Sequence, residues 1–305
     1  MRILVVGAGA VGGYFGGRLA QAGRDVTFLV RAKRAEQLRA GGLRIVSPHR
    51  NLTFQPKIAT AARIDGPYEV ILLGVKSYAL SDAMRDFAPA VGADTLIVPV
   101  LNGMRHIDLL IDRFGRAVLG GACWVVTDLG ADGQIVQMND IQKLNYGELD
   151  GQITARAKLL DETLRGAGFD ATLSAGIVSD MWGKWVQLAS LGAATCLLRG
   201  NVGEIVSVPG GSELVRSIIR ECAGIAAACG YPPAESSLEQ LDVNLTRAGS
   251  PLASSMYRGL HAGAPVEVDA ILGDLLEKGK EHEVSTPLVQ AAFVALSLYQ
   301  RRRGK

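Results

Sequence analysis

Short hydrophobic runs alternate with amphipathic segments in the first half of the chain. Four runs rich in β-branched residues predict strands, at 3–6, 26–30, 70–75 and 96–100. Between them, hydrophobic positions recur with a helical period over 11–22, 34–40 and 80–87. Strands that alternate with helices are typical of a parallel sheet covered by helices on both faces. The pattern therefore predicts an α/β domain with a doubly wound parallel sheet.

The pattern changes twice further along the chain. Three consecutive strands are expected at 122–128, 134–138 and 143–146, with Ala131-Asp132-Gly133 as the turn of a hairpin. A helix at 155–166 and a short strand at 171–173 follow. After about residue 175 only helical periodicity is found, over 177–198, 212–229, 238–247, 266–278 and 287–302. We therefore expect a Rossmann-type domain at 1–175 and an all-α domain at 176–305.

A glycine-rich turn separates the first predicted strand from the first predicted helix. Gly7 permits a tight turn, Gly9 lets the backbone approach phosphates, and Gly12 allows the helix to pack closely on the strand. The helix N-terminus adds unpaired N–H groups and the positive end of a dipole. This order of elements predicts a dinucleotide site, and the expected cofactor-binding residues of the turn are Gly7, Ala8, Gly9, Ala10, Val11 and Gly12.

The end of the second predicted strand indicates which dinucleotide binds. A site for NAD commonly has a carboxylate about 20 residues after the glycines, to bind the ribose hydroxyls. Here the strand is followed by three cations, Arg31, Lys33 and Arg34. Cations favour NADPH, and Arg31 is expected to bind its 2′-phosphate because a guanidinium can pair two oxygens. Lys33 and Arg34 are equally well explained as surface charges at a helix start.

Composition excludes several other classes of protein. The 305 residues are 48% hydrophobic, and 32 basic against 30 acidic residues give a formal charge of +2, so no strong field favours nucleic acid or an anionic membrane. The longest apolar stretch, 188–198, is too short to span a bilayer. No leader-like segment precedes the first strand, so a cytoplasmic location is expected. The cysteine and histidine spacings predict neither disulfides nor a metal site.

Further short motifs, most of them with a polar residue, follow the glycine turn in one order along the chain: Lys76, Asn102-Gly103, Trp182-x-Lys184, Ser254-Ser255-Met256 and Glu267. Together with the turn and Arg31, they resemble the ketopantoate reductase family, NADPH-dependent enzymes of pantothenate synthesis. The resemblance implies a Rossmann domain followed by a helical domain like that of 6-phosphogluconate dehydrogenase. It also implies that Lys184 is catalytic, that Ser255 binds the substrate carboxylate, that Asn102 and Glu267 contact both cofactor and substrate, and that Lys76 binds the cofactor.

The chemistry of ketone reduction fits these residue types. Hydride transfer to a ketone carbon leaves negative charge on the carbonyl oxygen, and Lys184 can stabilise and protonate that oxygen in a cleft between the domains. A lysine on an amphipathic helix is otherwise commonly solvated, and flanking tryptophans favour the cleft. Glu267 can hold the ammonium, or it is an exposed glutamate of a first helical turn. Ser255 is equally suited to capping a helix.

The chain departs from the family at four positions that usually hold substrate-binding asparagines: Leu188, Gly192, Val202 and Leu252. Asn201 lies next to Val202 and can compensate there. Lost amides weaken the prediction of a hydroxylated substrate. The first prediction is NADPH-dependent reduction of a 2-oxo acid, 2-dehydropantoate (ketopantoate) to pantoate. The alternatives are a paralogue that reduces a more apolar 2-oxo acid or another carbonyl, and a non-catalytic NADP(H)-sensing module. An apolar helical domain is also compatible with a homodimer.

Overall fold

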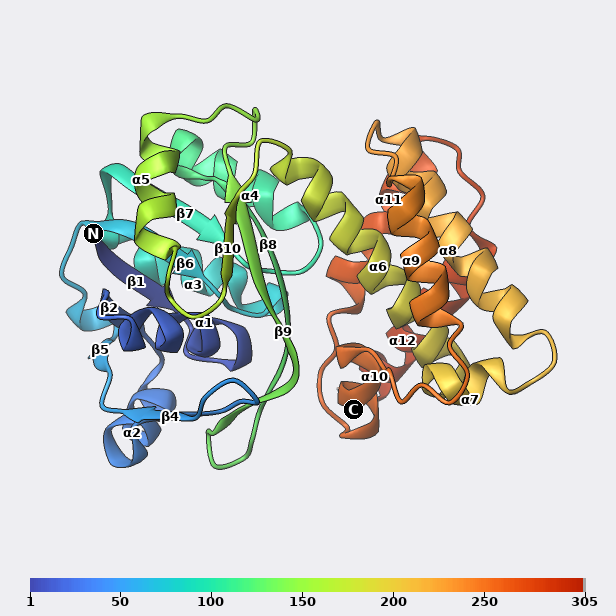
Figure 1. The fold of residues 1–305 in the computed structure, drawn as a ribbon, viewed down its shortest axis with the longest axis horizontal. Coiled ribbons are helices and arrows are strands. Elements are labelled where there is room, and N and C mark those ends of the chain that lie inside the picture. Colours follow the sequence, from blue (N-terminus) through green and yellow to red (C-terminus); the bar gives the residue numbers. More distant parts are fainter. Residues whose placement is uncertain (304–305) are drawn as a thin grey trace. The chain divides into compact units, whose positions relative to one another are not determined.

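The computed structural model describes residues 1–303, which form two compact units (Figure 1). The first unit contains residues 1–101 and 106–178. The second contains residues 102–105 and the chain from Ser179 onward. Gly304 and Lys305, which end the predicted helical domain, lie outside the described residues. The short segment 102–105 therefore belongs to the second unit although its neighbours in sequence belong to the first.

The first unit is built on a five-stranded parallel sheet, which confirms the predicted fold class. The strand order is β5-β2-β1-β6-β7. The strands are β1 (Arg2–Val6), β2 (Asp25–Leu29), β5 (Lys57–Ala59), β6 (Tyr68–Leu73) and β7 (Val91–Pro99). The helices between them are α1 (Ala10–Gln21), α2 (Ala32–Gly41) and α3 (Leu80–Phe87), and α4 (Arg105–Phe114) follows β7. The sequence pattern did not predict β5 or α4.

Both faces of this sheet are buried, which explains the unbroken hydrophobic runs of its central strands. Ile3 and Val5 of β1 belong to one core, together with side chains of α1. Leu4 and Val6 of β1 point the other way, into a second core that contains side chains of α3 and α4. Alternate residues of one strand therefore serve two cores, and helices cover each face.

A second sheet packs on α1 within the same unit. Its strand order is β10-β9-β3-β4, with β8 paired to β9. These strands are β3 (Leu43–Val46), β4 (Leu52–Phe54), β8 (Gly120–Leu129), β9 (Ile135–Gly147) and β10 (Asp170–Leu173), and α5 (Ala155–Leu164) precedes β10. A side chain at Gly17 of α1 would press on Ile45, so glycine lets helix and sheet approach closely. The pattern did not predict β3 or β4.

The expectation of separate strands at 134–138 and 143–146 is wrong. Both ranges belong to the single strand β9. The pairing with β8 shifts between Val125 and Thr127, where the β9 partner changes from Gln142 to Gln137. The polar residues of this irregular stretch break the hydrophobic alternation without ending the strand. The predicted hairpin turn before β9 is confirmed, with Gly133 at a φ of +76°.

The described residues of the second unit form helices (Figure 1). They are α6 (Ile177–Leu198, which begins in the first unit), α7 (Val202–Val206), α8 (Gly211–Ala228), α9 (Glu235–Leu245), α10 (Ser255–His261), α11 (Asp274–Glu281) and α12 (Pro287–Arg303). The helix predicted at 266–278 contains a π-helical turn at Asp269–Gly273 before α11. The indole Nε1 of Trp185 on α6 donates to the carbonyl of Ile271 in this turn at 2.9 Å. A contact from a distant helix thus accompanies the local departure from α-helical pairing.

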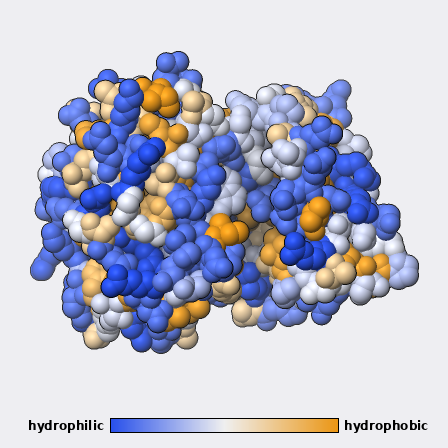
Figure 2. Space-filling model, in the orientation of Figure 1, coloured by the Kyte–Doolittle hydropathy of each residue, from blue (hydrophilic) through white to orange (hydrophobic). Residues whose placement is uncertain are grey.

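The face of the molecule drawn in Figure 2 is largely hydrophilic. Figure 2 shows hydrophilic residues over most of the visible face, with hydrophobic residues in small separate groups. Among the described residues, no helix is long and apolar enough to cross a membrane. The described part of the chain also holds no group of three or more potential metal-ligating side chains of His, Cys, Asp or Glu. The four cysteines, all within the described residues, form no disulfide. Burial raises the pKa of Cys196 to about 11, so this thiol is protonated at neutral pH.

Candidate functional site

The glycine turn has the geometry that a diphosphate requires. Gly7 adopts a φ of +93°, and a side chain at Gly12 would clash with the carbonyl oxygen of Gly7. A Cβ at Gly9, in contrast, would meet nothing within 4 Å. Gly9 is also the N-cap of α1, which has no side-chain cap and no acidic residue in its first turn. Open space above Gly9 and the uncapped positive end of α1 fit the pyrophosphate of a dinucleotide.

The segment that carries Lys76 lies directly beside this turn. Gly74 follows β6, and a Cβ built on it would lie 2.6 Å from the Cα of Gly12. Its amide donates to the carbonyl of Val6 at 3.0 Å. Lys76 comes two residues later, is exposed, and precedes the 3-10 turn Ser77–Ala79. The carboxyl ends of β1 and β6 therefore bring Lys76 near the glycine turn.

Arg31 and Arg34 occupy different environments after β2. The side chain of Arg31 is 68% exposed at the N-cap of α2, and its Nη2 lies 3.1 Å from Oδ2 of Asp82. Arg34 is half-buried, and its Nε donates to the carbonyl of Ala8 in the glycine turn at 3.0 Å. Burial, together with the nearby charge of Arg44, lowers the pKa of Arg34. The sequence left open whether Arg34 is a surface charge. In the structure its side chain is half-buried and bonded to the backbone of the glycine turn.

Lys184 lies in the second unit and is buried. Only 7% of its surface is exposed, so the interpretation as a solvated lysine is wrong. Its neighbours Trp182 and Trp185 are also buried, with ring centroids 4.9 Å apart. The bond from Trp185 to Ile271 fixes this turn of α6 against the π-helical turn. Because charged groups in protein interiors are costly unless they are compensated, a buried ammonium indicates a specialised environment.

Glu267 is also buried in the second unit, with 7% of its surface exposed. The alternative interpretation as an exposed glutamate of a first helical turn is therefore wrong. It lies two residues before the π-helical turn that accepts the hydrogen bond of Trp185. The Trp185 contact consequently links the segment that carries the carboxylate to the helix that carries Lys184.

The residue after Asn102, Gly103, lies against the π-helical turn. Gly103 has a φ of +77°, and a side chain there would clash with the carbonyl oxygen of Ala270. Arg105 binds Asp274 at 3.2 Å, which ties the segment 102–105 to the start of α11. Burial raises the pKa of Asp274, against the opposing effect of Arg105. The segments that carry Asn102, Lys184 and Glu267 thus meet at the π-helical turn.

Ser255 is the first residue of α10 and is exposed. The N-cap is its neighbour Ser254, whose Oγ accepts from the amide of Tyr257 at 3.0 Å. Ser254 also forms a hydrogen bond with Thr195 of α6 at 2.9 Å. The interpretation of Ser255 as the helix cap is therefore wrong, and the start of α10 lies against α6.

The positions that lack the family's asparagines have structural roles or apolar neighbours. A side chain at Gly192 would clash with the terminal methyl group of Met256. Asn201 does not provide a free amide oxygen, because its Oδ1 caps α7 by accepting from the amide of Glu204 at 2.9 Å. The amide of Val202 instead donates to the carbonyl of Leu252 at 2.9 Å. The sequence analysis named Met256 only as part of the Ser254-Ser255-Met256 motif and did not predict its contact with Gly192, which spans 64 positions along the chain.

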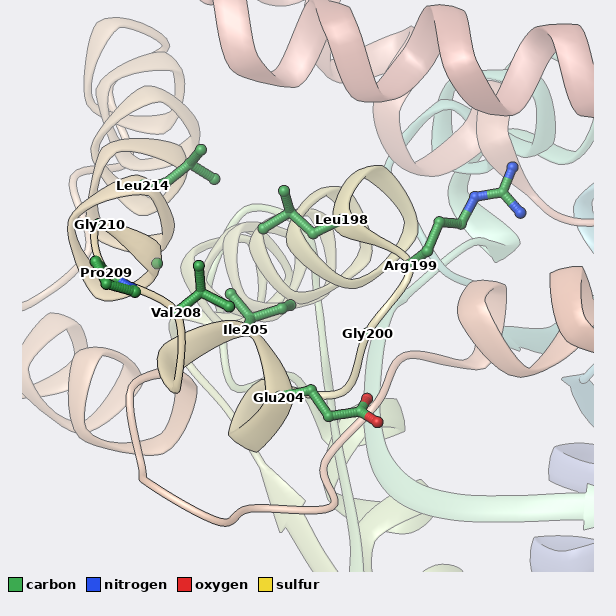
Figure 3. Close-up of a pocket in the computed structure, with 10 residues that line it drawn as sticks. Leu198, Arg199, Gly200, Glu204, Ile205, Val208, Pro209, Gly210 and Leu214 are labelled. Carbon is green, nitrogen blue, oxygen red and sulfur yellow. The ribbon is translucent and has the colours of Figure 1, made fainter.

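A pocket of about 460 Å³ lies at the other end of α6 (Figure 3). Leu198, Ile205, Val208 and Leu214 give it apolar walls, and the side chain of Arg199 points away from them. Leu198 comes 14 residues after Lys184, which corresponds to about 21 Å along an α-helix. The pocket contains none of the predicted site residues and is separate from the candidate site.

Comparisons with known proteins cover nearly the whole chain. Residues 3–151 match the family model described as ketopantoate reductase PanE/ApbA, and residues 176–300 match the model of its C-terminal part. The chain is 34% identical to an uncharacterized oxidoreductase, YkpB, of Bacillus subtilis, over 99% of this chain and 100% of the relative. It is 26% identical to a 2-dehydropantoate 2-reductase of Mesorhizobium japonicum, over 100% and 99% of the two chains. The crystal structure of 2-dehydropantoate 2-reductase from Geobacter metallireducens has a TM-score of 0.89 and 27% identity, over 98% and 99%.

Proposed function

Because this chain belongs to the ketopantoate reductase family, we propose that it reduces a 2-oxo acid to the corresponding 2-hydroxy acid with NADPH. The family consists of nicotinamide-dependent oxidoreductases, and this chain is one of them. Ketopantoate is the first substrate to test. The observation that supports the proposal most directly is the buried Lys184, linked through Trp185 to the segment that carries the buried Glu267.

The proposed cofactor site uses residues of both units. In the first unit, the backbone from Gly7 to Gly12 would hold the pyrophosphate, while Arg31 would bind the 2′-phosphate and Lys76 would add a nearby positive charge. In the second unit, Asn102 and Glu267 would contact the nicotinamide riboside. NADPH, when bound, supplies the hydride.

The proposed chemistry at the substrate is proton donation by Lys184. The carbonyl carbon would receive the hydride that bound NADPH supplies as it becomes NADP⁺, and the carbonyl oxygen would take a proton from the Lys184 ammonium. Positive charge at Lys184 would also stabilise negative charge that develops on that oxygen. Ser255 and Asn102 would bind the substrate, with the exposed hydroxyl of Ser255 at its carboxylate.

The test of this function is substrate-dependent loss of NADPH absorbance. We expect turnover with ketopantoate or with another member of a panel of 2-oxo acids, and none with the corresponding 2-hydroxy acids. If no 2-oxo acid or other carbonyl compound oxidises NADPH, while titration shows that NADPH binds, the result would favour the NADP(H)-sensing module. A homodimer and a cytoplasmic location remain separate proposals, and light scattering of the purified protein would test the first.

Replacement of Arg31 is expected to raise KM for NADPH more than KM for NADH. The Arg31→Asp change should raise KM for NADPH at least about tenfold more than KM for NADH, because a charged hydrogen bond to phosphate is exchanged for repulsion. Arg34→Gln should weaken both nucleotides to a similar extent, because Arg34 holds the carbonyl of Ala8. Arg39→Asp, on an exposed position of α2, is the matched control. Equal changes for both nucleotides in Arg31→Asp would show that Arg31 does not recognise the phosphate.

A further inference from the structure

The face of α6 that carries Lys184 continues as an apolar surface. Residues four and eight positions after Lys184 lie on the same side of the helix, and these are Leu188 and Gly192. Side chains on a helix lean toward its N-terminus, so Leu188 covers the turn that carries Lys184. Leu188 is half-buried. The group four residues beyond the lysine on this face is therefore a branched hydrocarbon.

The next position on this face is covered by a thioether. Met256 is 3% exposed, and its terminal methyl group occupies the space that a side chain at Gly192 would need. Met256 follows Ser255 directly, at the start of α10. The hydrogen bond between Ser254 and Thr195 holds this end of α10 on α6. Two elements thus contribute methyl groups along the interval between Lys184 and Ser255.

The amide oxygen of Asn201, beside the substituted position Val202, is already in use. The Oδ1 of Asn201 accepts the N3 amide of α7 in a capping box with Glu204. A substrate hydroxyl placed beside Leu188 and the methyl group of Met256 would exchange hydrogen bonds to water for apolar neighbours.

We propose that the preferred substrate is a short 2-oxo acid whose side chain is apolar and carries no hydroxyl. This inference rests on the proposed function and specifies the substrate class of the same site. Lys184 would face the 2-oxo group and Ser255 the carboxylate, so the remaining side chain packs against Leu188 and the methyl group of Met256. Each turnover would add one hydride to C2 and one proton to the carbonyl oxygen, and one NADPH would become NADP⁺.

A matched pair of substrates tests the proposal directly. 3,3-Dimethyl-2-oxobutanoate differs from ketopantoate only by the absence of the terminal hydroxyl. We expect kcat/KM for the deoxy compound to exceed that for ketopantoate by about tenfold, roughly the value of one uncompensated hydroxyl. A site built to bind that hydroxyl would instead prefer ketopantoate by about 100-fold or more. The second result would overturn the inference and leave the reductase function intact, whereas no turnover with any 2-oxo acid would reject the function itself.

Variants on α6 and α10 test which side chains determine the substrate preference. Leu188→Asn should shift the kcat/KM ratio toward ketopantoate by about tenfold, because it supplies an amide beside Lys184. Leu198→Asn makes the same chemical change on an exposed position at the far end of α6 and should leave the ratio unchanged. Met256→Ala should raise the ratio of kcat/KM for 2-oxohexanoate to that for 2-oxobutanoate by about threefold or more. The variant removes a buried side chain, and the longer substrate can fill the space and regain the lost methylene contacts. Unchanged ratios in both site variants would place the preference elsewhere, while the wild-type pair of substrates decides the proposal even if a variant fails to fold.

Discussion

Replacing Lys184 by alanine is expected to lower kcat by about three orders of magnitude, the range of a lost general acid that also stabilises charge on the carbonyl oxygen. The affinity for NADPH should change by less than about threefold, because the proposed phosphate contacts lie in the other unit. Lys184 is buried on α6, so the variant removes an ammonium that bulk solvent does not replace directly. Stopped-flow absorbance gives the rate of hydride transfer, and fluorescence titration gives the dissociation constant of NADPH.

Two further variants distinguish loss of the ammonium from a folding defect. Lys184→Met keeps an unbranched side chain of similar length without the charge, and it should lose as much activity as the alanine variant. Lys280→Ala removes an exposed lysine from α11 and should retain full activity. If Lys184→Met folds, binds NADPH and turns over at the wild-type rate, the assignment of the general acid is wrong.

Substitution of Gly12 by alanine is expected to disturb the cofactor site and the fold together. Its methyl group would clash with the carbonyl oxygen of Gly7, which is backbone and has no other rotamer to adopt. We expect the free energy of unfolding to fall by about 1–3 kcal/mol, the usual range for overpacking. NADPH affinity should fall by about 100-fold, because α1 must move away from the turn whose N–H groups would bind the pyrophosphate.

Gly9 provides the matched comparison, because the same methyl group there would meet nothing within 4 Å. Gly9→Ala should leave the free energy of unfolding within about 0.5 kcal/mol of the wild-type value, as for a change that disturbs no contact. NADPH affinity should nevertheless fall by about tenfold or more, since the proposal places the pyrophosphate in this open space. Chemical denaturation and fluorescence titration measure the two effects. Unchanged NADPH affinity in Gly9→Ala would contradict the proposed path of the cofactor.

Much of the fold could be predicted because its strongest signals are local. The central strands β1 and β6 are buried on both faces, so they appear as unbroken hydrophobic runs. The strands that the pattern did not predict, β3, β4 and β5, are three or four residues long and mix polar with apolar positions. The second partner of β3 lies far along the chain, as in the register of Ile45 with Ile135. Short strands of this kind depend on the sheet that receives them.

The candidate site divides in the same way between local and long-range information. The order of glycines at Gly7, Gly9 and Gly12 predicted their conformational roles, since a positive φ and a close helix contact follow from the lack of a Cβ. The sequence could not decide whether Glu267 is buried, because the segments that cover it come from other parts of the chain. The π-helical turn beside it was equally inaccessible, because the indole that contacts it lies 86 residues earlier.

The sequence by itself determined most of the longer elements of both halves, the dinucleotide turn and the family resemblance, because hydrophobic periodicity and glycine spacing act over a few residues. Only the tertiary structure decided which of several similar side chains has which role. It assigned the cap of α10 to Ser254 and left Ser255 exposed, and it placed Arg34 on the glycine turn while Arg31 stayed at the surface. These choices depend on partners distant in sequence, and a buried polar group is stable only when the packed fold supplies such partners.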